Sequence, residues 1–457
     1  MPTLIDDTIA AIATPKGRNG IGVIRLSGGD ARKIAEAVCG CRGVGFRDRC
    51  TRLRRIRRPK TGEVLDQAMV TYFRAPRSYT AEDVVEIGCH GSPVVLEAVM
   101  AALLEAGARL ATPGEFTLRA FLRGRIDLVQ AEAIRDLVEA KTLFQARVAR
   151  QQAEGSLSRR LKPIKELLVR LISLLEAGID FADDDVPVLA EEAILDQLQP
   201  VVAALRELEV GFGRGRLLSG GIAVAVVGRT NVGKSTLFNT LLRQERAIVN
   251  ERPGTTRDVV AEEAHLGGIP VRWLDTAGIR RSTDPVERIG IDKTREVLAD
   301  ADRLLLVLDG SVEHTEEDSR LLEELKQQAC CLVINKIDLP QRLSGESLGD
   351  MEAPVVRVSA LTGEGVETLR QVLIEDLGQG KAVEQGGALV TNLRQQEQIG
   401  EALKALTRAG GAVEQGLPHE LILLDLHTAL RALNELTGET GIEDILGRIF
   451  QTFCVGK

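Results

Sequence analysis

The sequence is poor in aromatic residues and has no long apolar run. Phe, Trp and Tyr make up only 3% of its 457 residues, which leaves few rings to stack on nucleic-acid bases. No apolar stretch reaches the ~18 residues that a membrane-spanning helix needs. The segment from Met1 to Asp7 has neither a basic region nor a long apolar one, so we expect no secretory signal peptide.

Cysteine is also scarce, and its seven copies are an odd number. In a long chain without an export signal we expect reduced thiols and a cytoplasmic protein. The cysteines nearest to one another in the first part of the chain are Cys39, Cys41, Cys50 and Cys89, the last followed by His90. Their spacing matches no familiar pattern of zinc ligands, so a metal cluster is not expected.

Charged residues, by contrast, are abundant and nearly balanced. Lys and Arg number 58 and Asp and Glu number 66, which gives a net charge of −8. With 27% charged and 44% apolar residues, the composition is that of an ordinary globular protein and excludes a collagen, a disordered acidic protein or a disulfide scaffold. At about 150 residues per domain, the length predicts about three domains.

The hydrophobic pattern changes along the chain and predicts a multidomain α+β and α/β protein. Residues 1–120 mix β-like runs with glycine-rich turns, typical of an α+β domain, and the run 93–106 is helical. Residues 121–218 and 381–457 have helical periodicity. Residues 219–380 alternate strands and helices, the pattern of a mostly parallel sheet. We therefore expect one helical domain into which a Ras-like P-loop domain is inserted.

Three local patterns carry further predictions. The last helical segment is expected to bury a stripe formed by Leu421, Leu424, Ala429, Leu433 and Leu436. Glycines within 211–215 predict a hinge, and the run 183–187 predicts a break between helices. The turn at 265–269 predicts a hairpin that adds one antiparallel edge to the parallel sheet.

A phosphate-binding loop opens the inserted module. Residues 228–235 read Gly-Arg-Thr-Asn-Val-Gly-Lys-Ser and stand between an apolar run at 223–227 and a helix-like run. The glycines let backbone N–H groups surround the phosphates, Lys234 supplies positive charge, and Ser235 offers a hydroxyl to Mg²⁺. The pattern and its context predict a nucleotide site.

Three later motifs each follow an apolar run. Asp275–Gly278 can hold Mg²⁺ through water and offer an N–H to the γ-phosphate. Asn335–Asp338 ends in a carboxylate that can accept the ring N–H and the amine of guanine, which adenine does not present together. Ser359–Leu361 can cap the base with a backbone N–H. Four motifs in this order predict a GTP-binding hydrolase.

Hydrolysis needs groups outside these motifs. The run Gly254–Asp258 stands where the first switch loop is expected, and a threonine there can bind Mg²⁺ and the γ-phosphate. Ile279 follows the second motif and cannot orient a water molecule as a glutamine would. The residues alone leave open an arginine finger from Arg257, Arg280 or Arg281, a monovalent cation bound by Asn231, and a water positioned by Glu287.

Seven short segments indicate which family of GTP-binding proteins the chain resembles. They lie at 13–20, 79–83, 113–122, 127–133, 286–290, 447–450 and 453–457, the last reading Phe-Cys-Val-Gly-Lys. With them, the whole chain resembles the MnmE (TrmE) family of bacterial and organellar tRNA modification GTPases. The first and last segments are more diagnostic of this family than the phosphate loop, which many families share.

The resemblance implies a bacterial cytoplasmic enzyme that adds an aminomethyl-type, carboxymethylaminomethyl group to C5 of the wobble uridine of tRNA. The one-carbon unit comes from 5-formyl- or 5,10-methylene-tetrahydrofolate, bound by an N-terminal domain that also forms a homodimer. A partner protein that uses FAD and NADH completes a heterotetramer. The two G domains associate when K⁺ and GTP are bound, and this activates hydrolysis.

The resemblance also implies roles for residues of the G domain. Glu287 orients the attacking water, with Asn231 and Lys234 as further catalytic residues. Ser235 and Thr256 bind Mg²⁺. Asn231, Asn250, Arg252 and Thr255 bind K⁺. The full nucleotide and cation site comprises Asn231, Val232, Gly233, Lys234, Ser235, Thr236, Asn250, Glu251, Arg252, Pro253, Gly254, Thr255, Thr256, Asp275, Thr276, Ala277, Gly278, Asn335, Lys336, Asp338, Ser359 and Ala360. Asn250 departs from a family threonine, a change that a backbone carbonyl ligand would survive.

Four residues match the folate site of the family, namely Arg25, Glu86, Arg125 and Lys457. A carboxylate such as Glu86 suits the ring N–H and amine of a pterin, and Arg or Lys suits the glutamate tail of the folate. Arg125 stands where the family has lysine, so the charge is kept although the geometry of the group differs.

Two questions stay open at the level of sequence. The segment 42–60 has nine basic residues against one acid, Asp48, which suits a tRNA-binding patch and equally a solvated edge strand. The G-domain motifs also suit a ribosome-assembly GTPase that binds rRNA. A scaffold without hydrolysis is disfavoured because Ser235, Thr256, Asp275 and Glu287 are all present.

Overall fold

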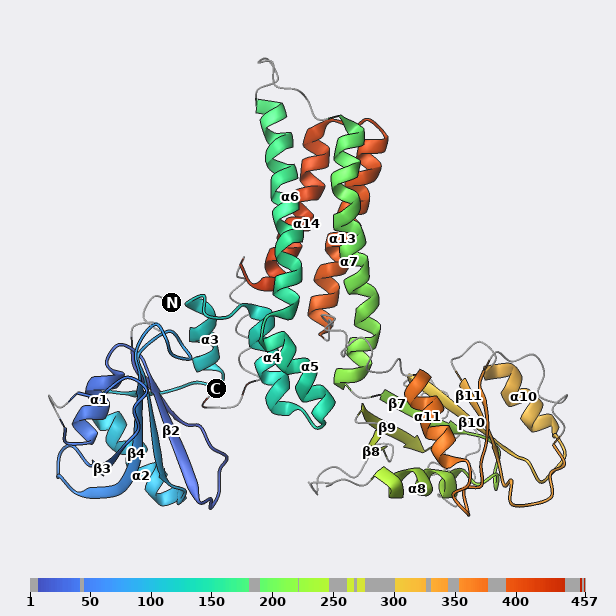
Figure 1. Ribbon diagram of the computed structural model, residues 1–457, viewed down its shortest axis with the longest axis horizontal. Coiled ribbons are helices and arrows are strands. Elements are labelled where there is room, and N and C mark those ends of the chain that lie inside the picture. Colours follow the sequence, from blue (N-terminus) through green and yellow to red (C-terminus); the bar gives the residue numbers. More distant parts are fainter. Residues whose placement is uncertain are drawn as a thin grey trace, which may run out of the picture. The chain divides into compact units, whose positions relative to one another are not determined.

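The computed structural model describes most of the chain in two compact units (Figure 1). The described residues are 7–41, 45–180, 190–220, 222–245, 261–266, 269–275, 301–325, 330–343, 353–376, 392–439, 453 and 456. The first unit comprises 1–135, 152–198 and 404–457, and the second comprises 136–151 and 199–403. The predicted helix break at 183–187 lies outside the described residues.

The first unit begins with a six-stranded sheet in the order β3-β4-β5-β2-β1-β6. The strands are β1 (Ile9–Ile12), β2 (Ile21–Ser27), β3 (Arg52–Arg57), β4 (Val64–Phe73), β5 (Val84–His90) and β6 (Arg109–Leu110). Two helices, α1 (Ala31–Val38) and α2 (Pro93–Glu105), pack their apolar side chains against the sheet. The α2 helix confirms the helical prediction for 93–106, and the apolar alternation of β2 and β5 explains why one face of the sheet forms the core.

The basic segment forms an edge of this sheet. Its strand β3 pairs with β4 alone, and only Ile56 is fully buried, whereas Leu53 and Arg55 are exposed. Charged side chains on an edge strand oppose pairing with another chain. The edge-strand interpretation of this segment is therefore confirmed, and its use by tRNA stays a prediction.

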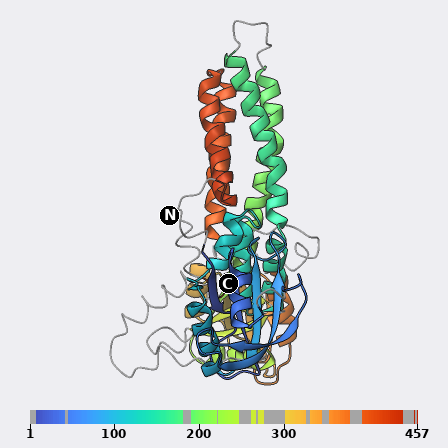
Figure 2. The ribbon, with the colours of Figure 1, turned by 90° about the vertical axis from the view of Figure 1, so that its left-hand side faces the viewer.

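The helical part of the first unit contains α3 (Glu115–Leu122), α4 (Leu128–Glu139), α6 (Ser156–Asp180) and α14 (His419–Thr437). The α6 and α14 helices pack along each other and lie side by side in both views (Figure 1 and Figure 2). Apolar residues of α6 such as Leu161, Leu168 and Leu175 are buried. Hydrogen bonds between the two helices join residues 251 and 272 positions apart, as expected for a helical domain interrupted by another module.

The predicted stripe on α14 is partly wrong. Leu421 and Leu424 are 50% and 66% exposed. The buried stripe consists of Ile422, Leu423, Leu426, Ala429, Leu433 and Leu436. Steps of four and three residues from position 422 keep a side chain on one helix face, whereas the step of five from 424 to 429 does not.

The second unit contains a six-stranded sheet in the order β12-β11-β10-β7-β9-β8. Its strands are β7 (Ile222–Val227), β8 (Ala261–Leu266), β9 (Ile269–Asp275), β10 (Arg303–Asp309), β11 (Cys330–Asn335) and β12 (Val355–Arg357). All neighbours are parallel except β8 and β9, which pair as the predicted hairpin with Leu266 opposite Ile269. The helices α8 (Lys234–Glu245), α10 (Glu316–Leu325) and α11 (Val366–Asp376) alternate with the strands. This arrangement is the predicted α/β module.

Three further helices complete the described chain, namely α5 (Leu143–Ala153), α7 (Glu191–Gly220) and α13 (Leu393–Glu414). The hinge predicted within 211–215 is wrong, because α7 is one helix of 30 residues through this segment. Glycine weakens a helix by about 1 kcal/mol per residue, which a long helix can tolerate. None of the helices in the described residues is long and apolar enough to cross a membrane.

Candidate functional site

The phosphate loop connects β7 to α8 and depends on two glycines. Gly228 and Gly233 have φ of +151° and +97°, and Asn231 also adopts a positive φ of +64°. A Cβ added at Gly228 would lie 2.3 Å from the carbonyl oxygen of Val307, and one added at Gly233 would lie 2.3 Å from Nδ2 of Asn335. Only glycine therefore allows the loop to turn this close to β10 and β11.

Lys234 stands at the first residue of α8, below this loop. Its Nζ donates hydrogen bonds of 2.7 Å to the carbonyl oxygens of Gly228 and Arg229. Ser235 and Thr236 follow in the first turn of the helix and are exposed. The ammonium group and the N–H groups of the helix N-terminus are thus placed to bind phosphate, and the Ser235 hydroxyl suits Mg²⁺.

Asn335 connects the phosphate loop to the base-binding loop. It ends β11, and its side chain is buried. Its Nδ2 donates to the carbonyl oxygen of Val232 at 2.8 Å, and its Oδ1 accepts from the N–H of Ala360 at 2.9 Å. Thr240 adds a hydrogen bond of 2.8 Å from Oγ1 to the carbonyl oxygen of Ala360. One amide therefore fixes the distance between the loops that would hold the two ends of a nucleotide.

Lys336 and Asp338 take different positions in the same motif. Lys336 has φ of +63° and forms an ion pair of 2.6 Å with Asp309, the last residue of β10. Burial alone would raise the pKa of Asp309, but hydrogen bonds from Lys336 and Ser311 hold that pKa below its usual value. Asp338 is exposed and so can receive a guanine base. The sequence interpretation missed Asp309. A carboxylate that directly follows the apolar run 304–308 was a sequence signal that could have marked it as a site residue.

Several predicted residues lie outside the described residues. These are Asn250 to Thr256, Arg257, Thr276 to Gly278, Ile279, Arg280, Arg281, Glu287 and Lys457. Of Asp275 only the backbone is described, at the end of β9.

Among the described residues, no group of three or more His, Cys, Asp or Glu side chains is arranged to hold a metal. Burial raises the pKa of the Cys39 thiol to about 12.

A second cluster lies in the first unit, where two predicted folate residues meet. Arg25 on β2 stands opposite Glu86 on β5 and donates from Nε and Nη2 to the same oxygen, Oε1, at 2.9 and 2.7 Å. Its Nη1 donates to the carbonyl oxygen of Gly456 at 3.3 Å. The guanidinium carbon lies 5.7 Å from the ring centre of Tyr79 and 5.9 Å from that of Phe116. The two aromatic rings were not predicted.

Buried charges support the loop and the helix beside this cluster. Glu82 and Arg119 are 3% and 2% exposed and form an ion pair of 3.4 Å. Glu82 also accepts from Ser27 Oγ at 2.7 Å and pairs with Arg123 at 2.8 Å. Arg119 pairs with Glu115 at 2.9 Å, one turn earlier on α3. Since buried charges need partners, this network fixes α3 against the 78–83 loop.

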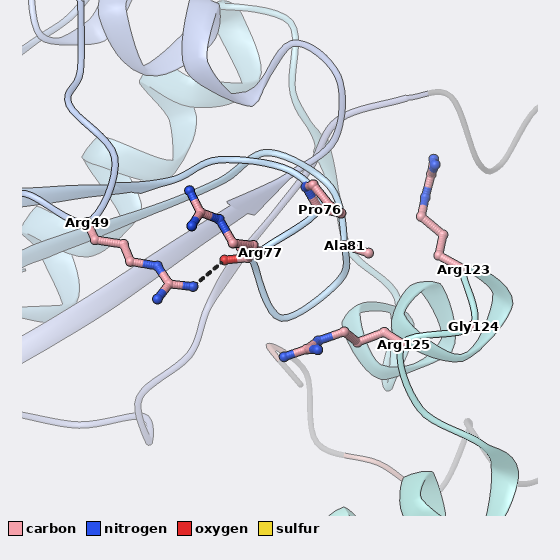
Figure 3. A pocket seen from close by; sticks show the side chains of 7 residues that line it. All are labelled: Arg49, Pro76, Arg77, Ala81, Arg123, Gly124 and Arg125. Carbon is pink, nitrogen blue, oxygen red and sulfur yellow. Dashed lines mark hydrogen bonds between the residues drawn. The ribbon is translucent and has the colours of Figure 1, made fainter.

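Arg125, the third described folate candidate, lines a separate pocket (Figure 3). The pocket has a volume of about 410 Å³, and its lining includes neither Arg25 nor Glu86. It is formed by Arg49, Pro76, Arg77, Ala81, Arg123, Gly124 and Arg125. The structure thus brings Arg25 and Glu86 together and places Arg125 at another point of the same unit.

Comparison with known proteins covers nearly the whole chain. Residues 8–125 match the family model of the GTP-binding protein TrmE N-terminus, and residues 128–454 match that of the MnmE helical domain. Proteins named tRNA modification GTPase MnmE from Koribacter versatilis, Heliobacterium modesticaldum and Aquifex aeolicus are 49%, 45% and 40% identical to it. Each alignment covers 99% of this chain and 100% of the relative.

Among solved structures, the G domain of the T. maritima FeoB iron transporter is 30% identical over 35% of this chain and 99% of its own length, with a TM-score of 0.27.

Proposed function

Because the chain belongs to the MnmE family of tRNA modification GTPases and is itself a GTPase, we propose that it couples GTP hydrolysis to modification of the wobble uridine of tRNA. The product is an aminomethyl-type, carboxymethylaminomethyl substituent at C5. The reaction takes place in the bacterial cytoplasm, in a homodimer joined by an FAD-dependent partner. The observation that carries this proposal is the Arg25–Glu86 pair beside Gly456, a polar cluster that a GTPase switch alone does not need.

The Arg25–Glu86 pair has the chemistry to hold a tetrahydrofolate. Both hydrogen bonds from Arg25 go to Oε1 of Glu86, and Oε2 is left for the ring N–H of a pterin. The pair is about one quarter exposed, with side-chain exposures of 21% and 32%, so a ligand can reach it. The folate, when bound, supplies the one-carbon unit. Lys457 follows Gly456 directly and is assigned to the same site.

In the G domain, guanine is assigned to Asp338 and the phosphates to Lys234 and the helix N-terminus behind it. Ser235 and Thr256 are assigned to Mg²⁺, and the exposed hydroxyl of Ser235 suits that role. Asn231 is exposed at the loop, so its amide oxygen can serve K⁺ together with the 250–255 segment. Glu287 orients the attacking water. Hydrolysis then changes how the two G domains of the dimer associate, and the helical domain transmits this change.

Nucleoside mass spectrometry of tRNA tests the proposal. Cells without the protein should lack the C5-modified wobble uridine, and the wild-type protein should restore it. The Glu287→Ala variant should bind GTP normally, hydrolyse it poorly and fail to restore the modification. Glu317→Ala, which removes an exposed carboxylate from α10, is the matched control and should behave as wild type.

Two results would contradict the proposal. Unchanged wobble uridines in the deletion strain would point instead to a GTPase of ribosome assembly, and such a protein should not bind 5-formyltetrahydrofolate. Normal GTP turnover by Glu287→Ala would remove that residue from the mechanism, whatever the state of the tRNA.

A further inference from the structure

The pocket of Figure 3 gathers positive charge at one place. Its arginines, Arg49, Arg77, Arg123 and Arg125, come from three separate segments of the chain and are called here the arginine pocket. Among the described residues that line it, none is acidic. In a protein of net charge −8, four guanidinium groups around about 410 Å³ indicate a site for an anion with several charges.

Three of these arginines, Arg49, Arg77 and Arg125, make few contacts with the described residues. Arg49 donates from Nη2 to the carbonyl oxygen of Arg77 at 2.9 Å, and Arg77 is 3.5 Å from the carboxylate of Asp48. The Arg125 side chain is exposed and forms no hydrogen bond or ion pair with the described residues, whereas its backbone N–H donates to the carbonyl oxygen of Ala120 at 2.8 Å. Arg123 is held by the buried Glu82. A guanidinium carries five N–H donors, so Arg49, Arg77 and Arg125 keep donors for a ligand beyond the contacts named above.

The arginine pocket is connected to the Arg25–Glu86 pair by two elements. Tyr79 contacts Arg25, and Arg77 and Ala81 on the same loop line the pocket. Phe116 also contacts Arg25 and lies in the first turn of α3, and Arg125 follows the end of that helix. A helix of eight residues spans roughly 12 Å. A folate is elongated, with its pterin at one end and its glutamate carboxylates at the other, so one ligand can reach both places.

We propose that the arginine pocket binds the γ-linked oligoglutamate tail of a folate whose pterin is held by Arg25 and Glu86. The inference rests on the proposed folate role and adds that the polyglutamylated form is the preferred ligand. Each added glutamate brings one more carboxylate, which an arginine binds through two parallel hydrogen bonds. Confinement to a pocket favours this ligand over an RNA backbone, which follows extended basic surfaces such as the β3 edge.

A comparison of the affinities for two forms of folate, which differ only in the length of the glutamate tail, tests whether the arginine pocket binds that tail. We would titrate the full-length protein with 5-formyltetrahydrofolate as the monoglutamate and as the pentaglutamate. The pentaglutamate should bind about tenfold more tightly, as expected for two or three exposed ion pairs. That advantage should shrink at high salt, because exposed charges are screened.

The matched variants are a double substitution, Arg49→Ser with Arg77→Ser, and a control, Arg55→Ser. Arg49 and Arg77 are exposed and make few contacts, so their loss should leave the fold intact. Arg123 is left unchanged because its removal would take one of the charged partners from the buried Glu82. The double variant should bind the two folates within about twofold of each other. Arg55→Ser, which removes an exposed arginine of β3 outside the pocket, should keep the tenfold difference.

The outcomes are distinct. Equal binding of both folates to the wild type, or an unchanged advantage in the double variant, overturns the inference and leaves the folate role standing. Failure of the wild type to bind even the monoglutamate refutes the folate role, and the inference falls with it. Loss of tRNA binding by the double variant, with its folate preference unchanged, assigns the pocket to RNA instead.

Discussion

Replacement of Asn335 by alanine should destabilise the G domain strongly. The substitution removes both hydrogen bonds of the buried amide and leaves the carbonyl oxygen of Val232 and the N–H of Ala360 without a partner. A buried polar group without a partner costs about 1–3 kcal/mol. Two such groups predict a loss of roughly 3–4 kcal/mol in the free energy of unfolding of this domain.

The chain contains its own probe for this measurement. Its single tryptophan, Trp273, is buried in β9 next to β7. Urea unfolding followed by tryptophan fluorescence therefore reports on the G domain alone. With a denaturant dependence of about 2 kcal/mol per molar urea, the midpoint of Asn335→Ala should fall by roughly 1.5–2 M.

Thr240→Val is the matched control for this experiment. It removes one hydroxyl, which lies within hydrogen-bond distance of the carbonyl oxygens of Thr236 and Ala360, and should cost about 1 kcal/mol or less because neither bond is fully buried. A midpoint for Asn335→Ala close to that of the wild type, or equal to that of Thr240→Val, would refute the reasoning that the amide joins the two loops.

Two further predictions concern the first unit. Arg25→Met should weaken binding of 5-formyltetrahydrofolate at least about tenfold by calorimetry, since the guanidinium holds Glu86 in place, and should leave GTP hydrolysis unchanged. Burial would raise the pKa of Glu115, but hydrogen bonds from Arg109 and Arg119 hold it below the usual 4.5. The ionised Glu115 therefore stabilises the folded protein when the pH is above the usual pKa of 4.5. This stabilisation is lost as the pH falls through the lowered pKa of the folded state. Thermal unfolding followed by circular dichroism should show Glu115→Gln less stable at neutral pH and less sensitive to acid than the wild type; equal acid sensitivity would contradict this.

The sequence predicted the elements whose local pattern is strong. The phosphate loop and the β8–β9 hairpin depend on neighbouring residues, so their turns could be predicted from spacing. The register of α14 could not, because leucines are frequent on both faces of that helix, and packing against α6 decides which are buried. Glycines within 211–215 were interpreted as a hinge, although a long helix tolerates them.

The arginine pocket could not be predicted from the sequence. Arg49, Arg77 and Arg123 are far apart along the chain, and no short motif contains two of them. They meet because the 74–83 loop, the segment before β3 and the end of α3 come together in the fold. In the same way, Asp309 ends β10 and Lys336 directly follows the neighbouring strand β11, and no sequence pattern paired these two residues.

The bond between Arg25 and Gly456 joins residues 431 positions apart. At a synthesis rate of about 5–20 residues per second, a ribosome needs roughly 20–90 seconds to add the second partner after the first. The contact of Arg25 on β2 with Gly456 can therefore form only after the ribosome has synthesised the whole intervening G domain. A prematurely terminated chain would carry every nucleotide motif and still lack this contact, so GTP hydrolysis alone would not distinguish it from the complete enzyme.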